Sequence, residues 1–332
     1  MIEGKKQPLI LWQQPMKRVL YALSPAMLAS IWFFGWRSLV VLVVANAAAF
    51  LTEFLFLRAR REPVSSAVFV TAFLLALSLP PTIPYWMAAV GAAFAVIFGK
   101  MIFGGYGRNL LNPALTGRVF LYLTFAGPLT ARWVQPLVSA AGPLRFPTSW
   151  GGFTRFAADA VSSATPLALL HDGRPVDLLP LLWGNVSGSL GETSAVLLAL
   201  GGIYLLATRS ANWRIVASEL AAFLALQTAL WLARVPRASD PLSALLAGSL
   251  LLGMLFMSTD PISAAQTQGG RWIYGALIGV LTVLIRTFSI WPEATGFAIL
   301  LGNTFSGIID YFVRQSRERA KARVAPPAPE RK

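Results

Sequence analysis

The chain has 332 residues, of which 56% are hydrophobic and only 13% are charged, and its mean hydropathy is +0.62. Soluble domains carry about 25% charged residues, so this composition excludes a soluble globular enzyme. The sequence lacks cysteine and has a single histidine, His171, which excludes cysteine-ligated clusters, disulfides and a bis-histidine haem within the chain. The net charge of +14 is interpreted as juxtamembrane Lys and Arg, and a nucleic-acid partner is not expected.

Hydrophobic stretches follow one another almost continuously along the chain. A bilayer-spanning helix needs roughly 20 mostly apolar residues. The stretches do not alternate with polar residues, so they predict helices and not a membrane β-barrel. We therefore expect an all-α polytopic membrane protein with about ten transmembrane helices. The predicted spans are residues 18–36, 38–57, 63–80, 84–103, a short span at 112–126, 191–208, 213–233, 241–259, 272–289 and 293–313.

The Lys and Arg residues predict the orientation of these spans, because such residues gather on the cytoplasmic side. Residues 1–17 and the basic tail 314–332 are expected in the cytoplasm, and Arg234 and Arg237 are a minor exception on the opposite side. The long polar stretch 127–190 is then extracytoplasmic. Its apolar piece Leu178–Trp183 is predicted to be re-entrant or interfacial.

Two parts of the chain resemble each other. In each, a span ends at a proline turn and the next one starts near a tryptophan, Trp86 or Trp272, and Asn112 and Asn303 then fall at similar offsets. Five spans per repeat is an odd number, so residues 18–126 and 191–313 would form two inverted five-helix repeats with a site near the midplane. Chance similarity between apolar sequences is the alternative.

Three polar segments are candidates for a site. Asp159-Ala160-Val161-Ser162-Ser163-Ala164-Thr165-Pro166 reads, taken alone, as a turn before a proline. Gly104-Gly105-Tyr106-Gly107-Arg108-Asn109-Leu110-Leu111-Asn112-Pro113 would permit close approach of a helix or a flat ligand, and Asn112 would start a short helix whose first N–H groups receive a polar ring edge or simply a cap. The small residues around Glu192 suit a tight turn, in which Glu192 is either an ion-pathway residue or a first-turn acid.

Acidic residues at apolar depth form a fourth candidate set. A charge at the bilayer centre costs about 2.5–3.5 kcal/mol on insertion scales, so such acids face a cavity or a partner. We expect Arg271 or Arg286 to pair with some of them, with interfacial snorkelling as the alternative for Glu53 and Glu293. Asp260 and Asp310 are the candidates for cation handling. The set comprises Glu53, Glu219, Asp260, Glu293 and Asp310.

Four stretches together resemble one known family. They are FGGYGRNLLNPALTGRVFLYL, GNVSGSLGETSA, FMSTDPISAAQTQGGRWIYGALIGVLTVLIR and FAILLGNTFSGIIDYFVRQ. Their sequence and order are similar to those of the family shared by the B subunit of the sodium-translocating NADH:quinone reductase and the D subunit of the Rnf complex. The resemblance runs from about residue 18 to residue 323 and implies a fold similar to that of urea and ammonium channels.

The resemblance also implies flavin cofactors. The family joins FMN through its phosphate to a threonine, at a motif similar to D-x-x-[ST]-G-A-T that is read by an extracytoplasmic flavin transferase. Here the matching residues are Asp159, Ser162, Ser163, Ala164 and Thr165, so Thr165 is the expected attachment residue and Ser163 replaces the glycine. The family also holds a noncovalent riboflavin, which would place riboflavin or a quinone near Gly104, Gly105, Asn109 and Asn112.

The resemblance therefore implies a subunit of an ion-translocating electron-transport complex in the bacterial inner membrane. Its partners would be the other Rnf-type or Nqr-type subunits, including a flavoprotein subunit that carries covalent FMN. Electrons would pass from FMN on Thr165 towards riboflavin, coupled to Na⁺ or H⁺ transport. The chain contains no nicotinamide motif, no catalytic set and no metal site of its own. A flavin-free channel or transporter on the same scaffold is the alternative, because Ser163 departs from the attachment motif.

Overall fold

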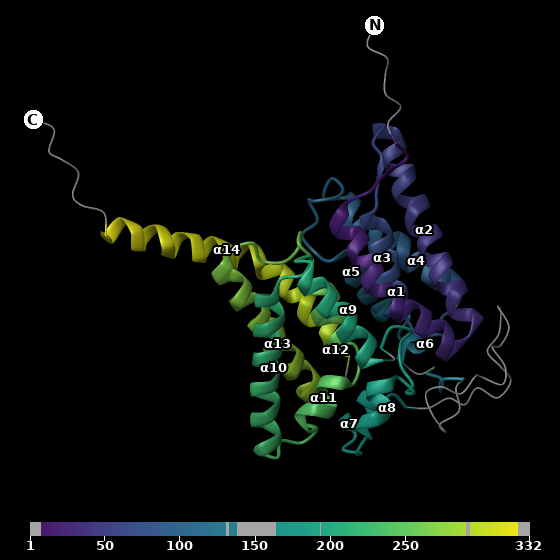
Figure 1. Cartoon of the computed structure of the whole chain (residues 1–332), viewed down its shortest axis with the longest axis vertical. Coiled ribbons are helices and arrows are strands. Elements are labelled where there is room, and N and C mark those ends of the chain that lie inside the picture. Colours follow the sequence, from purple (N-terminus) through teal and green to yellow (C-terminus); the bar gives the residue numbers. More distant parts are fainter. Residues whose placement is uncertain (1–7, 131–132, 138–163, 193, 290–292, 325–332) are drawn as a thin grey trace, which may run out of the picture.

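The computed structural model describes residues 8–130, 133–137, 164–192, 194–289 and 293–324, and this part of the chain is mostly helical (Figure 1). In chain order the elements are β1 (Ile10–Leu11), α1 (Gln14–Phe34), α2 (Trp36–Arg60), β2 (Val64–Ser65), α3 (Ala67–Leu77), α4 (Tyr85–Val96), the π-helical turn η1 (Ile97–Met101), α5 (Pro113–Thr124), α6 (Ala126–Thr130), α7 (Pro166–His171), α8 (Leu178–Trp183), α9 (Ala195–Ala207), α10 (Trp213–Leu232), α11 (Pro241–Leu246), α12 (Leu250–Leu252), the π-helical turn η2 (Gly253–Met257), α13 (Gln268–Phe288) and α14 (Thr295–Val324).

Four helices of the described part are long and apolar enough to cross a bilayer. They are α2, α10, α13 and the portion Thr295–Ala320 of α14, and shorter apolar helices occupy Ala67–Leu77, Tyr85–Met101 and Ala195–Ala207. Large apolar side chains such as Leu28 and Leu232, each 68% exposed, lie on the outside of the bundle. Such a surface needs lipid around it, which confirms a polytopic membrane protein.

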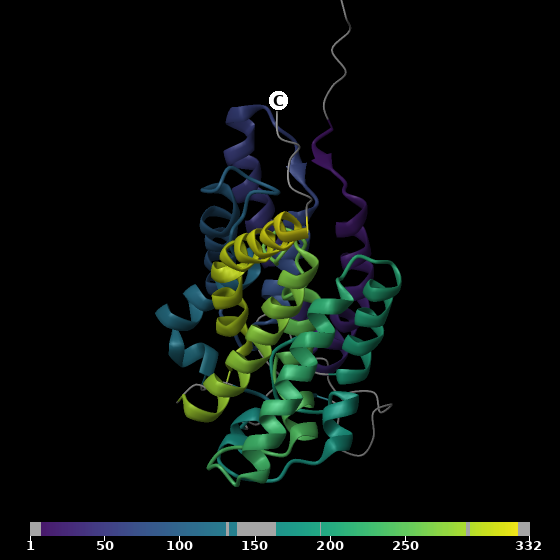
Figure 2. The same cartoon turned by 90° about the vertical axis from the view of Figure 1, so that its left-hand side faces the viewer.

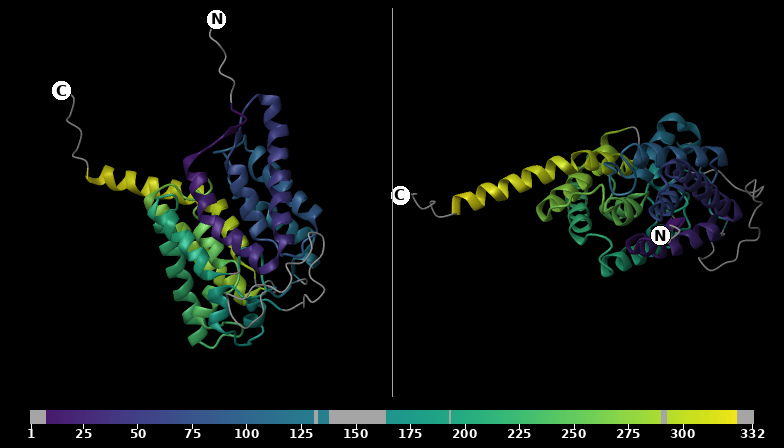
Figure 3. Two further views of the ribbon diagram at one scale, coloured as in Figure 1. Left: turned by 45° about the vertical axis from the view of Figure 1, so that its right-hand side comes forward. Right: turned by 90° about the horizontal axis from the view of Figure 1, so that it is seen from above.

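The helices of the two parts of the chain lie side by side. Figure 1 and the left view of Figure 3 show α1–α5 on one side and α9–α14 on the other. In the first part α2 packs against α4, and α4 against α5, while in the second part α10 packs against α13, and α13 against α14. The short helices α7 and α8 lie at one end of the bundle, and the C-terminal part of α14 projects near the opposite end (Figures 1 and 2).

The predicted span 241–259 is not one helix. It breaks after α11, where Ala247 is extended and Gly248 adopts a φ of +72°, before α12 and η2 resume the path. The Arg286 guanidinium accounts for the stability of the break, because it donates to the carbonyl oxygens of Ala244 and Ala247 at 2.6 and 3.2 Å. A buried arginine thus satisfies the acceptors that the missing helical bonds would otherwise leave unpaired.

The start of the chain is held against the turn between α2 and α3. Strands β1 and β2 pair in parallel, with Ile10 opposite Val64 and Leu11 opposite Ser65. The Gln13 N–H donates to Ser66 Oγ at 3.0 Å, and that hydroxyl donates back to Gln13 Oε1 at 2.6 Å. Trp12 stacks on Phe69 at 5.8 Å between ring centroids, so the first described residues and α3 form one connected unit.

Glycine permits the close crossing of α4 and α5. A Cβ added to Gly117 would lie 2.6 Å from the Gly91 carbonyl oxygen and 2.7 Å from Ala95 Cβ. Such distances leave no room for a side chain, as is common where membrane helices pack through small residues. This crossing fixes where α5 begins, and the start of α5 borders the candidate site.

Candidate functional site

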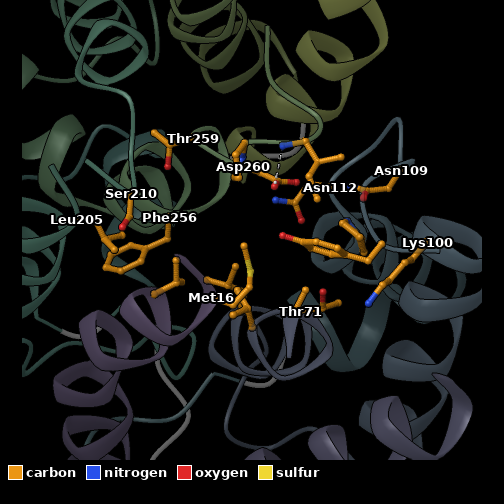
Figure 4. A pocket seen from close by; sticks show the side chains of 18 residues that line it. Met16, Thr71, Lys100, Asn109, Asn112, Leu205, Ser210, Phe256, Thr259 and Asp260 are labelled. Atoms are coloured by element: carbon orange, nitrogen blue, oxygen red, sulfur yellow. Dashed lines mark hydrogen bonds between the residues drawn. The ribbon is translucent and has the colours of Figure 1, made fainter. Parts of the chain in front are cut away.

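A cavity lies where the two parts of the chain meet (Figure 4). In Figure 4 Met16 of α1 and Thr71 of α3 lie on one side of the cavity, Asp260 and Asn112 lie across from them, and Leu205 of α9 and Phe256 of η2 form a wall between the two. Polar side chains enter from the ends of broken helices: Lys100 from η1, Asn109 and Asn112 from the loop before α5, and Asp260 from the turn after η2. Irregular backbone beside a cavity is typical of membrane proteins that bind polar groups within the bundle.

Lys100 forms a buried ion pair at the edge of this cavity. Its Nζ lies 2.8 and 2.7 Å from the two carboxylate oxygens of Glu53 on α2, and Glu53 Oε1 also accepts the Ser65 N–H at 3.1 Å. The side chains are only 3% and 1% exposed, so Glu53 does not snorkel to an interface. The Lys100 ammonium also lies 5.7 Å from the centre of the Tyr106 ring.

Asp260 borders the cavity with bonds made mostly inside its own turn. Its Oδ1 accepts the Ile262 N–H at 3.2 Å, and its Oδ2 accepts the Ser263 hydroxyl at 2.9 Å. Burial raises the pKa of this carboxyl, and the hydrogen bonds from Ser263, Ile262 and Asn109 oppose that shift. Among the described residues no Lys or Arg lies within ion-pair distance of Asp260, so its charge is free to meet a ligand or a cation.

Tyr106 lies in the glycine-rich loop between η1 and α5. Burial raises the pKa of its hydroxyl, and the negative charge of Asp260 raises it further. The phenol therefore stays protonated and keeps its O–H as a hydrogen-bond donor. The Tyr106 O–H can donate a hydrogen bond and the Asp260 carboxylate can accept one, so this end of the cavity suits a ring that carries both acceptor and donor atoms.

Asn112 caps α5 and does not leave the helix start open. Its Oδ1 accepts the N–H groups of Ala114 and Leu115 at 3.0 and 3.3 Å, and its Nδ2 donates to the Met257 carbonyl at 3.1 Å. The Asn112 N–H donates to Asn303 Oδ1 at 2.9 Å. The two asparagines that fall at similar offsets in the two similar parts of the chain are thus in contact. The predicted cap at Asn112 is therefore confirmed, and a contact between its side chain and a ligand stays a prediction.

Gly104 and Gly105 are not among the cavity-lining residues. Their φ values are +102° and +101°, and a Cβ added to Gly105 would meet no atom within 4 Å. Glycine is therefore needed for the backbone conformation of the loop, and close approach of a helix is not the reason at Gly105. The loop in turn places Tyr106 and Asn109 at the cavity.

The other predicted ion-pathway residues lie away from this cavity. Asp310 of α14 accepts the N–H groups of Gln266 and Thr267 at 2.6 and 2.9 Å and the Thr267 hydroxyl at 2.6 Å, which caps α13. Glu192 precedes α9 without belonging to its first turn, and its Oε1 lies 3.8 Å from Arg118. The first-turn interpretation of Glu192 is thus wrong.

The expected pairing of Arg271 and Arg286 with acids is also wrong. Arg271 donates to the Ala265 carbonyl at 3.2 Å, and Arg286 donates to backbone carbonyls. Lys100 pairs with Glu53, and Arg118 contacts Glu293.

Thr165 lies at the start of α7. Its Oγ1 accepts the Ala168 N–H at 3.2 Å, and Ala164 before it is exposed. The other residues of the predicted attachment motif, Asp159, Ser162 and Ser163, lie outside the described residues.

Lys100 and Tyr106 are the site residues that sequence reasoning missed. Lys100 falls inside the predicted span 84–103, near its end, where a lysine is usually interpreted as a marker of the cytoplasmic side. A lone lysine in one span and a lone glutamate in another are a signal for a buried pair, because each needs a partner in the bilayer.

Comparison with known proteins shows extensive similarity. The model of the NQR2, RnfD, RnfE family matches residues 10–318. The chain is 38% identical to the D subunit of the ion-translocating oxidoreductase complex of Alcanivorax borkumensis, over 90% of each chain, and 38% identical to the D subunit from Halorhodospira halophila, over 90% of this chain and 89% of the relative. It is 39% identical to the B subunit of the Na(+)-translocating NADH-quinone reductase of Ectopseudomonas mendocina, over 80% of this chain and 64% of the relative.

Proposed function

The chain belongs to the NQR2, RnfD, RnfE family, and from that premise we propose that it is the flavin-carrying membrane subunit of an ion-translocating electron-transport complex of the Rnf or Nqr type. The relatives named above are subunits of ion-translocating oxidoreductases, and this chain is a multi-pass membrane protein. Its partners would be the other subunits of such a complex, including a flavoprotein subunit with covalent FMN, in the bacterial inner membrane.

Thr165 is the proposed attachment residue for FMN. The observation that carries this proposal is its position: a half-exposed hydroxyl at the first turn of α7, preceded by exposed Ala164 and outside the helices of the bundle. A flavin transferase would reach such a hydroxyl without unfolding the bundle. The linkage would be an ester between Thr165 Oγ1 and the flavin phosphate, formed from a flavin donor with a pyrophosphate bond: the new P–O bond forms as the pyrophosphate bond breaks, and the departing nucleoside monophosphate takes up the hydroxyl proton.

The bound flavin would accept and release electrons, and this chain would supply position and electrostatics. The covalent link to Thr165 would prevent dissociation and hold the ring within transfer range of its partners. The short turn between Thr165 and the buried Leu167 would fix the attachment point relative to the bundle.

The central cavity is the proposed site for a second ring, either riboflavin or a quinone. The lining supports this, because apolar side chains such as Met16 and Phe256 exclude water while Tyr106 and Lys100 carry polar hydrogens to one end. Lys100 would orient a ring carbonyl, and its pairing with Glu53 would keep the ammonium in place.

We also propose that the two parts of the chain are inverted repeats. Matching contacts support it. Glu53 accepts the backbone N–H of Ser65, 12 residues later, and Gln227 donates to the backbone carbonyl of Ser239, also 12 residues later, so the spacing matches although the direction of the bond is reversed. Lys100 and Arg286 each follow a tryptophan, Trp86 and Trp272, at the same distance along the fourth helix of their repeat.

Mass spectrometry of the Thr165→Ala variant tests the covalent flavin. Wild-type protein made beside an active flavin transferase should carry an FMN-sized adduct on the peptide that contains Thr165, and the variant should carry none. Because Thr165 Oγ1 caps α7, the variant should lose about 0.5–2 kcal/mol of stability and should still fold. An adduct on Ser162 or Ser163 would move the site, and wild-type protein without any adduct would refute it and favour a flavin-free transporter.

A further inference from the structure

A second cavity lies at the end of the bundle where α7 sits. Its walls come from α7, α10, α11 and α13 and from the turn after α10. The residues that carry polar groups into it are His171, Gln227, Arg237, Ser239 and Arg286. Two of them are arginines and none is acidic, so the lining is positively charged.

Arg286 is buried here without a carboxylate partner. The residue is 7% exposed, and its two terminal nitrogens donate to the carbonyl groups of Ala244 and Ala247. Its Nε has no hydrogen-bond partner among the described residues. Glu192 acts on it electrostatically but lies within ion-pair distance of Arg118 instead. The structure therefore buries a cation and neutralises it only in part.

Lys100 is the cation at the matching position in the first part of the chain, and its charge is neutralised by a carboxylate. There Lys100 lines the central cavity and bonds to both oxygens of Glu53. In the second part the side chain beside Arg286 in the cavity lining is Gln227, a neutral amide that donates to the Ser239 carbonyl oxygen at 2.8 Å, whereas Glu53 accepts the Ser65 N–H. The second cavity thus keeps the cation of the first and lacks its carboxylate. The two backbone carbonyls offset only part of the cost of burying this charge, and Nε still has no acceptor among the described residues, so an anion from outside the helices would stabilise the site.

The surroundings indicate which anion it is. Arginine nitrogens in a planar fork favour phosphate oxygens, and Arg237 provides a second guanidinium at the exposed rim. The cavity is also lined by Leu167, two positions after Thr165. A Cβ added to Gly248 would lie 3.4 Å from Arg286 Nη2 and 2.8 Å from Leu167 Cδ2, so Arg286 and the residue two positions after Thr165 approach the same point.

We infer that this cavity binds a phosphate ester through Arg286 and Arg237. Two sources have this chemistry: the flavin phosphate on Thr165, which rests on the function proposed above, and the headgroup of an anionic phospholipid at the membrane boundary. Both would place a negative charge where the first cavity has Glu53.

Thermal unfolding of the full chain in neutral detergent tests the site. Thr165→Ala protein has no covalent phosphate, and inorganic phosphate should raise its unfolding midpoint in a concentration-dependent manner. Adding Arg237→Gln should weaken the apparent affinity about tenfold, and adding Arg286→Gln should abolish the response. Arg234→Gln is the matched control, because Arg234 lies in the same turn without lining the cavity. If Arg286→Gln fails to fold, the comparison of Arg237→Gln with Arg234→Gln decides.

Two further arms distinguish the sources. If the covalent ester fills the site, flavin-loaded wild type should not respond to phosphate or to phosphatidylglycerol. If a lipid fills it, loaded wild type should respond to phosphatidylglycerol but not to phosphatidylcholine, and native mass spectrometry should find the anionic lipid bound. Lack of any response in the Thr165→Ala protein, or equal responses in all arginine variants, would overturn the inference. Absence of a flavin adduct would refute only the covalent source.

Discussion

At the scale of single residues, the central feature is the buried ion pair between Glu53 and Lys100. The sequence identified Glu53 as a charge at apolar depth but not Lys100 as its partner, because periodicity and composition do not say which charges meet. The pairing depends on how α2 crosses η1, and that is a tertiary property. The sequence therefore predicted the need for a partner correctly and assigned the wrong cations, Arg271 and Arg286.

Removal of one member of this pair should destabilise the protein strongly. Lys100→Met leaves a buried carboxylate without its cation, which costs about 3–5 kcal/mol. The double variant Glu53→Gln with Lys100→Met should recover most of that loss, since no charge then remains. Midpoints of thermal unfolding in detergent, compared in a double-mutant cycle, measure the coupling. Additive effects of the two changes would show that the pair has no energetic role.

Asp260 differs from Asp310 in what its carboxylate has to do. Asp310 holds the start of α13, whereas the Asp260 carboxylate lies beside the cavity and, in the part of the chain that the structure describes, has no Lys or Arg within ion-pair distance. Asp260→Asn should keep assembly and flavin content while weakening the dependence of electron transfer on the cation concentration. Turnover of the assembled complex against sodium concentration and pH, with flavin measured in parallel, gives the answer. Loss of assembly in proportion to activity would assign Asp260 a structural role.

At the scale of the elements, the predicted spans locate most helices to within a few residues. The failures have local causes. Residues 241–259 look continuous because Ala247 and Gly248 are apolar or neutral, yet the left-handed Gly248 ends the helix and Arg286, far along the chain, satisfies the break. Helix α14 continues to Val324 beyond the predicted end at 313, because the basic residues that end the apolar span are also good helix formers.

The crossing of α4 and α5 gives a prediction at this scale. Gly117→Ala should destabilise the protein by about 1–3 kcal/mol, because the new methyl meets the Gly91 carbonyl and Ala95. Gly307→Ala in α14 is the matched control. A Cβ there meets nothing within 4 Å, so the change should be neutral or stabilise by up to about 1 kcal/mol. Equal unfolding temperatures for the two variants would contradict the close packing.

At the scale of the whole molecule, the orientation in the membrane is testable because the chain has no cysteine of its own. Single cysteines at Asp172 and Ser316 replace exposed residues near opposite ends of the bundle. An impermeant thiol reagent applied to intact cells should label position 172 and leave position 316 unlabelled. Labelling at 316 alone would reverse the topology, and Thr165 would then be out of reach of an extracytoplasmic transferase.

The candidate site was only partly predictable from the sequence, because its walls come from helices that meet only in the folded bundle. Asn109, Asn112 and Asp260 were identified from their own segments, since each lies at a broken helix end. Met16, Thr71 and Leu205 contribute walls from three other helices, and nothing in those segments distinguishes them from ordinary core. Only the assembled bundle brings them together around one cavity.

The strand pair at the start of the chain has a consequence for that cavity. Because β1 is joined to β2, and Gln13 to Ser66, the first turns of α1 and α3 cannot separate without breaking a set of backbone and side-chain bonds. We therefore expect the wall that contains Met16 and Thr71 to move as one rigid unit. Space for a bulky guest has to come from the facing side, where the turn from Thr259 to Ile262 is tied mainly to itself. We therefore expect a bulky ligand to be accommodated by movement of the Thr259–Ile262 turn, with the Met16 and Thr71 side unchanged.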